Sequence, residues 1–408
     1  MDIDDTPEEA AFRAEARAWL DAHAIPKGHP DDFSLGLWTG AYDEETYIAR
    51  CQAWQRTLYD GGWAGITWPK EYGGRGGRPI DQVIFGQEQA RYGVSNGACM
   101  ISIGMAGPTL LAHGTTAQKD RLLPPMLRGD ELWCQLFSEP GAGSDLAALA
   151  TRAVRDGDEW VVTGQKVWTS SPDRARWGML LARTDAGVPK HRGIGWFVLD
   201  MTAPGIDVRP LRQMTGESHF SEVFLDEVRI PADHLVGGPG DGWKVAQTTL
   251  NSERSSIAGG VGATPEALIA FARRLGATGR PVVRQRLVDA HIRFELLRFL
   301  RYRNQTALSQ GRRPGAEASV MKLAFARYLQ ALTRTAIDAQ GAHGMLGGAD
   351  VIDDGMWLRR FLHSPSLRIA GGSDQVQANI MGERALGLQP EPRTDKDVPF
   401  RDLAGRVR

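Results

Sequence analysis

Two short segments carry side chains whose types and spacing suit the binding of a flat, redox-active ring. The first, from Trp133 to Asp145, reads Trp-Cys-Gln-Leu-Phe-Ser-Glu-Pro-Gly-Ala-Gly-Ser-Asp, and the second, from Gly164 to Ser171, reads Gly-Gln-Lys-Val-Trp-Thr-Ser-Ser. Together they offer an indole, several hydroxyls and a glycine-rich loop whose backbone can approach a ligand closely. A glycine-rich loop alone is more often an ordinary turn. The combination is what a bound isoalloxazine ring needs.

These two segments, in this order, closely resemble the flavin-contacting segments of the acyl-CoA dehydrogenase family. The resemblance covers nearly the whole chain and includes Trp68–Gly74 (Trp-Pro-Lys-Glu-Tyr-Gly-Gly), Gly114–Lys119, Phe224–Pro231 and Gln375–Gly387. It implies an α+β fold with an N-terminal helical domain, a middle antiparallel β-domain and a C-terminal four-helix bundle.

The resemblance implies that the chain is an enzyme that binds FAD and oxidises an acyl-CoA. In this family a carboxylate removes the proton α to the thioester and a β-hydride passes to flavin N5, which gives a 2,3-enoyl-CoA. Backbone at Phe137 and the Ser138 hydroxyl are expected at the N5 and pyrimidine side of the ring. Trp168 is expected against the ring, Ser170 to add a hydroxyl contact, and Ser144 to touch the pantetheine arm. The open alternative is that Trp168 is core packing.

The position of the catalytic base departs from the best-known family pattern. Many members place a glutamate before the Gly-Thr of a C-terminal Tyr-Glu-Gly-Thr, whereas this segment reads Ile369-Ala-Gly-Gly-Ser-Asp374. Gly371 stands where that glutamate is expected, and a glycine cannot accept a proton. The missing side-chain volume makes Gly371 a candidate substrate-binding position and suggests a bulky or branched acyl group.

A second glutamate matches the position from which a minority of the family, including isovaleryl- and long-chain-type enzymes, supplies the base. The stretch Thr249–Ser256 (Thr-Leu-Asn-Ser-Glu-Arg-Ser-Ser) resembles that helix. Glu253 matches the base, and Arg254 matches the arginine that follows, a candidate substrate contact. Burial beside flavin would raise the pKa of Glu253 toward the working pH. The alternatives are an exposed Glu253 paired with an arginine, or Asp374 as the base.

The adenosine end of FAD is expected to be shared between subunits and to contact four residues near positions that the family uses: Arg274, Gln285, Gln340 and Gly344. Two motifs depart from the family pattern. The usual Gly-Gly-x-Gly after the glutamine reads His343-Gly-Met-Leu346, and the usual Arg-x-x-Phe-Gly reads Arg274-Leu-Gly-Ala-Thr278 without its phenylalanine. Arg273 is an alternative to Arg274, and His343 is expected to be an ordinary loop histidine.

Bulk composition excludes several classes of protein. The 48 basic and 49 acidic residues leave a net charge of -1, so no overall field attracts nucleic acid or an anionic membrane. No stretch approaches the ~20 apolar residues of a membrane span, and the acidic N-terminus lacks the apolar region of a secretory signal. The three cysteines have neither disulfide-framework nor zinc spacing. We expect a cytoplasmic protein without a bound metal.

Hydrophobic periodicity divides the chain into three predicted domains and a tail: 1–130 (helical), 131–240 (a β-barrel or sandwich), 241–390 (a helical bundle) and 391–408. The first helix is predicted over residues 6–23. In the bundle, two apolar stripes are predicted to be core, one at Ile292, Leu296, Phe299 and Leu300, the other from Val320 to Ala336. The proline-containing, charged tail is predicted to be poorly ordered.

Three functions remain open. The leading hypothesis is an acyl-CoA dehydrogenase of lipid metabolism, a homotetramer or dimer whose electrons leave through an electron-transferring flavoprotein. The second is a flavin-dependent monooxygenase or oxidase of the same fold. The third is a non-catalytic partner subunit that completes the FAD site of another chain in a hetero-oligomer, although the intact Ser138 and Trp168 motifs argue against it.

Overall fold

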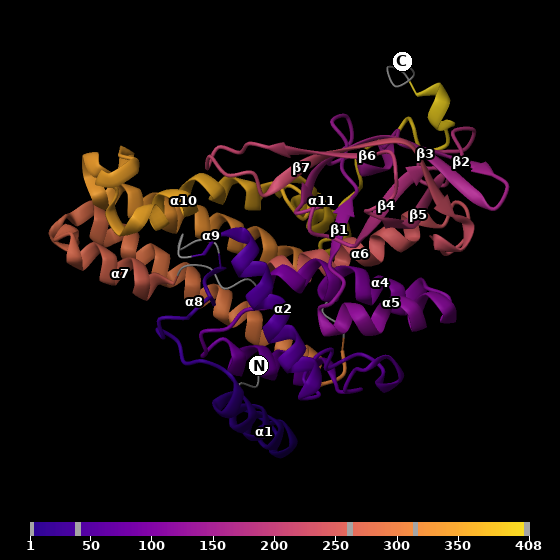
Figure 1. Cartoon of the computed structure of the whole chain (residues 1–408). Coiled ribbons are helices and arrows are strands. Elements are labelled where there is room, and N and C mark those ends of the chain that lie inside the picture. Colours follow the sequence, from indigo (N-terminus) through magenta and orange to yellow (C-terminus); the bar gives the residue numbers. More distant parts are fainter. Residues whose placement is uncertain (1–3, 37–41, 259–263, 313–316, 404–408) are drawn as a thin grey trace. The chain divides into compact units, whose positions relative to one another are not determined.

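The computed structural model describes residues 4–36, 42–258, 264–312 and 317–403, and Figure 1 labels its elements. The chain divides into two compact units, each assembled from separate stretches of sequence. The first unit comprises Met1–Trp54, Gly76–Gly97 and Arg254–Pro390, and the second comprises Gln55–Arg75, Ala98–Glu253 and Glu391–Arg408. The predicted domain boundaries near 130, 240 and 390 stay predictions, because each compact unit combines stretches from different predicted domains and so does not test where one domain ends.

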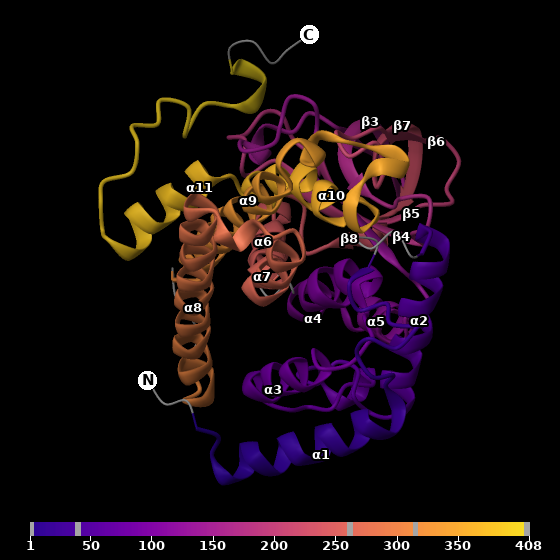
Figure 2. The ribbon, with the colours of Figure 1, turned by 90° about the vertical axis from the view of Figure 1, so that its left-hand side faces the viewer.

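The first unit is built from helices. They are α1 (Pro7–His23), most of α2 (Glu44–Asp60), α3 (Pro79–Gln89), α7 (Pro265–Arg274), α8 (Pro281–Ser309), α9 (Glu317–Gln340), α10 (Met356–His363) and α11 (Asp374–Ile380). Helix α1 begins as predicted, because the Thr6 side chain caps it by accepting a hydrogen bond from the Glu9 backbone. Figure 2 shows α1 and α3 side by side.

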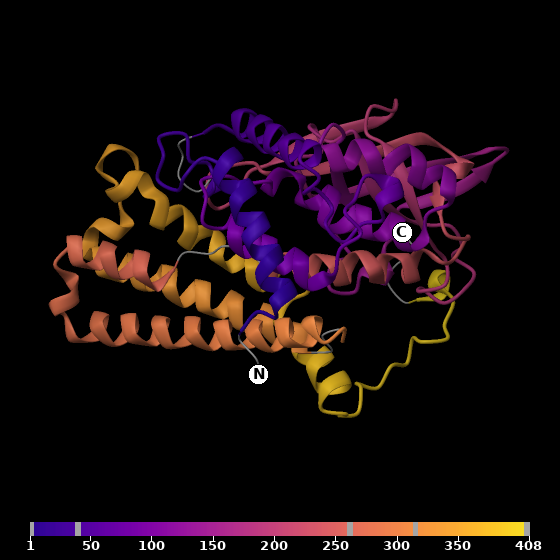
Figure 3. The same cartoon turned by 90° about the horizontal axis from the view of Figure 1, so that it is seen from below.

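Helices α7, α8, α9 and α10 share one apolar core, and Figure 3 shows the first three lying alongside one another. Phe271 of α7 packs on Trp357 of α10 with ring centres 5.4 Å apart. The predicted stripe on α9 is confirmed at Tyr328, Leu332 and Ala336, which are buried. The C-terminal part of the sequence therefore forms a helical bundle around aromatic side chains.

The stripe predicted on α8 is wrong as a core face. Ile292, Leu296 and Phe299 are exposed by 51%, 57% and 44%, and only Leu300 packs in part against the core. The buried face of α8 consists of Val283, Leu287, Ala290 and Leu297. A helix that is apolar on two faces gives a helical period on each, and periodicity alone does not tell which one the fold covers. The helix therefore presents a second apolar face to its surroundings.

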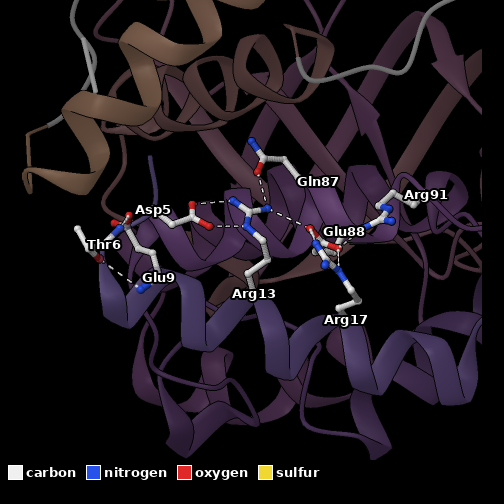
Figure 4. Close-up of polar contacts among 8 residues, drawn as sticks. All are labelled: Asp5, Thr6, Glu9, Arg13, Arg17, Gln87, Glu88 and Arg91. Carbon is white, nitrogen blue, oxygen red and sulfur yellow. Dashed lines mark hydrogen bonds and ion pairs between the residues drawn. The ribbon is translucent and has the colours of Figure 1, made fainter. Parts of the chain in front are cut away.

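A buried carboxylate ties α1 to α3. Glu88 of α3 accepts hydrogen bonds from Arg13 and Arg17 of α1 and from Arg91 just beyond the end of α3, at 3.1, 2.9 and 3.0 Å (Figure 4). Burial acts to raise the pKa of Glu88, but the bonds from Arg17 and Arg13 outweigh it and lower that pKa to about 2. The carboxylate therefore stays ionised and holds the two helices together at neutral pH.

The second unit contains the sheet, together with α4 (Gly107–His113), α5 (Thr116–Arg128) and most of α6 (Gly242–Ala258). Its strands are β1 (Trp133–Leu136), β2 (Arg152–Asp156), β3 (Glu159–Ser170), β4 (Trp177–Arg183), β5 (Ile194–Asp200), β6 (Ile206–Leu211), β7 (Phe220–Pro231) and β8 (Leu235–Val236). They form one sheet in the order β6-β7-β3-β2-β4-β5-β8, with β1 beside β4. The pairing is mostly antiparallel, as predicted, and β4 adds parallel partners in β1 and β2.

The predicted disorder of the tail is wrong for its described residues. Phe400 is buried, and the Arg183 guanidinium lies 3.9 Å from its ring centre. The backbone N–H groups of Phe400 and Arg401 donate to the carbonyls of Val188 and Ala186, at 2.9 and 3.0 Å. One aromatic anchor and two backbone bonds thus fasten a stretch whose composition resembles a linker.

Two expectations about the whole chain can be compared with the described residues. Cys51, Cys99 and Cys134 are buried free thiols, as expected for small apolar side chains. In the described part of the chain, every helix is too short or too polar to cross a membrane.

Candidate active site

Strand β1 leads into the first of the two segments that are predicted to bind a ligand. The strand ends at Leu136. In the loop that follows, Phe137 is buried and Ser138 is half-buried. Glu139 and Ala142 close that loop by exchanging two backbone hydrogen bonds of 3.0 Å. The Pro-Gly turn is therefore held at a fixed place beside the strand.

A buried ion pair joins the first segment to the second. Lys166 Nζ donates to Glu139 Oε1 at 2.8 Å and to the carbonyl of Phe137 at 3.1 Å. Glu139 also accepts from the backbone N–H groups of Ala150 and Thr151, at 2.6 and 2.9 Å. Burial opposes these contacts, but the pKa of Glu139 is still lowered by Lys166 and the hydrogen bonds, so the carboxylate is ionised. Both residues lie inside the segments read from the sequence, yet their role was missed there.

Trp168 is presented outward from the sheet. It lies in β3 where the register with β7 shifts between Lys166 and Thr169, and its φ is 63°. Few residues other than glycine adopt this left-handed conformation, and such strain is concentrated at functional sites. Trp168 is 57% exposed, and the only described ring against which its indole packs is that of Phe220, edge-on at 6.0 Å. The alternative that Trp168 is core packing is therefore wrong.

The two segments lie edge to edge, with open space beside the glycine-rich loop. The Val167 N–H donates to the Ser138 carbonyl at 2.9 Å. A Cβ atom added at Gly141 or Gly143 would meet no heavy atom within 4 Å, so the chain's own packing does not require glycine there. Close approach of a ligand does give a reason for these glycines. Ser170 is half-buried at the end of β3, and Ser144 is exposed after the loop.

Helix α6 lies beside β1 (Figure 1), and its residue Glu253 contacts Gln135 of that strand. A buried hydroxyl pair, Thr249 and Thr109, anchors α6 on α4 with 2.9 Å between the oxygens. Glu253 lies one turn beyond Thr249 and is half-buried, and its Oε2 accepts a hydrogen bond of 3.2 Å from Gln135 Nε2. Because Gln135 lies two residues before Phe137, the structure brings Glu253 to the strand that leads into the first segment.

Of two neighbours of Glu253, the sequence analysis identified Arg254 but not Gln135. Gln135 was missed, although a polar residue between the apolar neighbours Cys134 and Leu136 is a signal that could have identified it. Arg254 belongs to α6, but its side chain lies outside the described residues. Its predicted substrate contact stays a prediction.

The segment that lacks the family's usual glutamate lies in the first unit. Gly371 has a φ of 65°, and its carbonyl accepts a hydrogen bond of 2.7 Å from Gln377. Asp374 is buried and paired with Arg368 at 2.6 Å and with Arg327 at 3.6 Å. Both guanidinium groups lie against the same carboxylate oxygen, Oδ2. The geometry therefore disfavours Asp374 as the base.

The four residues expected at the adenosine end of FAD also lie in the first unit. Arg274 is paired with Asp353, Gln285 is exposed on α8, and Gln340 is buried and donates to the Ala336 carbonyl at 3.2 Å. A Cβ at Gly344 would approach the Ile337 carbonyl oxygen to 2.7 Å, so local packing already explains that glycine. His343 is exposed, as an ordinary loop histidine would be. The ligand roles of these four residues stay predictions.

Comparison with known proteins finds the same family along most of the chain. Three family models match: "Acyl-CoA dehydrogenase, N-terminal domain" over residues 6–130, "middle domain" over 134–228 and "C-terminal domain" over 240–386. The acyl-CoA dehydrogenase IpdE1 of Mycobacterium tuberculosis is 38% identical over 94% of this chain and 98% of its own length.

Two further proteins are similar. The acyl-CoA dehydrogenase FadE34 of the same organism is 44% identical over 82% of this chain, which spans about half of the length of FadE34 (46%). A solved structure described as "Tcur3481-Tcur3483 steroid ACAD" superposes with a TM-score of 0.79 at 29% identity, over 96% of this chain and 100% of that one.

Proposed function

Because the chain belongs to the acyl-CoA dehydrogenase family, whose members are flavoproteins, we propose that it is an FAD-dependent acyl-CoA dehydrogenase in which Glu253 is the base. The observation that carries this proposal is the hydrogen bond between Gln135 and Glu253. It brings a carboxylate beside the strand that leads into the first of the two flavin-type segments, Trp133–Asp145 and Gly164–Ser171, whereas Asp374 is paired with two arginines.

The residues of the second unit fit a flavin ring. An outward indole at Trp168, hydroxyls at Ser138 and Ser170, and unfilled space at Gly141 and Gly143 are the features that such a ring requires. When bound, FAD supplies the acceptor for the substrate's β-hydride. We assign Phe137 to the same ring contact and Arg274, Gln285, Gln340 and Gly344 to the adenosine end, and we propose an electron-transferring flavoprotein as the electron acceptor.

The chain's own part in the chemistry is to hold the thioester and take its proton. Glu253 would accept the α-proton, and the desolvation that accompanies substrate binding would strengthen it as a base. Ser144, exposed after the loop, is proposed to contact the pantetheine arm, and Arg254 and Gly371 to contact the substrate. The small residue at Gly371 removes volume where other members carry a glutamate, which favours bulky acyl groups.

The substrate class is tested by anaerobic flavin bleaching with three CoA esters: butanoyl-CoA, cyclohexane-1-carbonyl-CoA and the CoA ester of a steroid carboxylic acid. We expect the steroid ester or the cyclohexane ester to give the highest kcat/KM and a product that has lost two hydrogens. The resemblance to a structure described as a steroid ACAD supports this order. Fastest turnover of butanoyl-CoA would contradict the bulky-substrate proposal. A product that has gained oxygen would instead favour the monooxygenase hypothesis.

The exposed face of α8 supports the proposed homo-oligomer, because an apolar stripe at Ile292, Leu296 and Phe299 is typical of a subunit contact. We expect the double substitution Ile292→Glu and Leu296→Glu to lower the molar mass measured by light scattering after gel filtration. Val154→Glu is the matched control, because Val154 is an equally exposed apolar residue on β2. An unchanged mass in the double variant would contradict this interface. Co-purification of a different chain would favour the hetero-oligomer hypothesis.

A further inference from the structure

We propose that Gln135 is a positioning residue for Glu253: it orients the carboxylate and keeps it ionised in the resting enzyme. This inference rests on the proposed function, since it takes Glu253 as the base. The observation that supports the inference is the hydrogen bond of 3.2 Å from Gln135 Nε2 to Glu253 Oε2.

The sheet gives Gln135 a fixed position. It stands in β1 between Cys134 and Leu136, both fully buried, and its register partner is the buried Met179 of β4. Side chains alternate between the two faces of a strand, so the buried neighbours point away from the side that Gln135 occupies. The donor that reaches Glu253 therefore comes from a strand whose backbone is held in the parallel pairing with β4.

Helix α6 is held independently of this contact. The Thr249–Thr109 hydroxyl pair and a 2.8 Å bond between His113 Nε2 and Thr248 Oγ1 fasten α6 to α4 one turn before Glu253. The helix thus fixes where the Glu253 side chain begins, and Gln135 fixes one of its carboxylate oxygens. Two anchors at opposite ends of a flexible side chain define the direction of the base.

An amide suits both protonation states of a base. Its N–H donates to the carboxylate and so stabilises the ionised form. After proton transfer, the amide can rotate and present its carbonyl to the new carboxylic acid. A lysine or arginine would bind the carboxylate too strongly for it to act as a base, and an apolar residue would leave it without this partner.

The test is Gln135→Met in the FAD-loaded protein, with two readouts as a function of pH. The first is the protonated-carboxyl band of Glu253, taken from infrared difference spectra of each protein against the same protein carrying Glu253→Gln. The second is the single-turnover rate of flavin reduction by cyclohexane-1-carbonyl-CoA. Each readout gives a midpoint pH. Loss of one hydrogen bond to a charged group is expected to raise both midpoint pH values by about one unit, and to slow flavin reduction about tenfold at pH values below the midpoint.

The matched control is Gln165→Met. Gln165 Nε2 donates to Glu222 Oε1 at 3.0 Å, the same kind of half-buried amide–carboxylate pair between β3 and β7. This control is expected to leave both midpoints of Glu253 where the wild type has them. A purely structural effect of losing a glutamine from the sheet would appear in both variants as a lower rate without a shift in pH.

Gln135→Glu serves if the methionine variant does not fold, because it keeps the shape and replaces the donor by a second carboxylate. Two carboxylates at this distance titrate as a coupled pair, so its upper midpoint is expected to rise further than that of Gln135→Met. If the folded Gln135 variants have the same midpoint pH values as the wild type, the inference is overturned. Normal flavin reduction by Glu253→Gln is a separate outcome, and it would remove the proposed base itself.

Discussion

Replacing Glu253 by glutamine is expected to slow the reduction of bound flavin by an acyl-CoA ester about 10³- to 10⁴-fold, within the range that a general base contributes. Glutamine keeps the size of the side chain and cannot accept the α-proton. Ester binding should change little, because the carboxylate acts on the reacting carbon and not on the CoA moiety. The measurement is anaerobic stopped-flow bleaching of the flavin at a saturating ester concentration.

Glu222→Gln is the control for this substitution. Glu222 is also half-buried and also accepts a hydrogen bond from a glutamine side chain. Its partner Gln165 lies in the second segment, but Glu222 itself is assigned no contact with the flavin or the ester, so we expect its reduction rate to stay within about threefold of the wild type. If Glu253→Gln reduces its flavin as fast as Glu222→Gln does, Glu253 is structural. Asp374→Asn would then be the next variant to measure.

Replacing Lys166 by methionine is expected to lower the free energy of unfolding by about 3–5 kcal/mol, as found when one partner of a buried ion pair is removed. Glu139 would then be left buried without its cation, and the Phe137 carbonyl would lose its donor. Since these contacts join the two flavin-type segments, the purified variant should also hold less flavin per protein. Urea denaturation and the flavin-to-protein absorbance ratio measure the two effects.

The exposed ion pair of Arg229 with Glu159 provides the comparison for Lys166. Arg229→Met is expected to leave both the free energy of unfolding and the flavin content close to those of the wild type, because water screens this pair. Similar stability losses in the two variants would contradict the proposed role of the buried pair. So would full flavin content in Lys166→Met.

The ion pair also predicts how acid acts on the wild type. The folded-state pKa of Glu139 is lowered below its usual 4.5, so the stability that this carboxylate contributes is present above that value. It is lost as the pH falls from there through the folded-state pKa. The flavin-type loop should loosen in the same acidic range.

The fold could be predicted because short ordered motifs encode it, whereas the flavin contacts assigned to two of these motifs stay predictions. Trp168 and Ser138 were identified from neighbouring residue types, and the structure places their segments edge to edge. Their supports were harder to identify. Lys166 and Glu139 are charged residues that a composition-based interpretation assigns to the surface, and only the paired strands show that they neutralise each other in the interior.

Three features depended on tertiary contacts that periodicity does not contain. Gln135 meets Glu253 only because β1 and α6, separated by more than 100 residues, lie in the same unit. The apolar face of α8 at Ile292 has the sequence pattern of a core face, and only the packing of α8 against α7 and α9 shows that a different face is buried. The tail looks like a linker, although Phe400 inserts beneath Arg183.

A structure of the FAD-loaded protein with a non-reactive thioether analogue of its best CoA ester tests the central claim most directly. The account predicts a carboxylate oxygen of Glu253 within about 3.5 Å of the carbon that carries the α-proton, the separation expected for groups poised to react. It also predicts that Gln135 remains bonded to that carboxylate. The account would be contradicted if the α-carbon of the analogue lay beside Asp374, or if no carboxylate lay near that carbon.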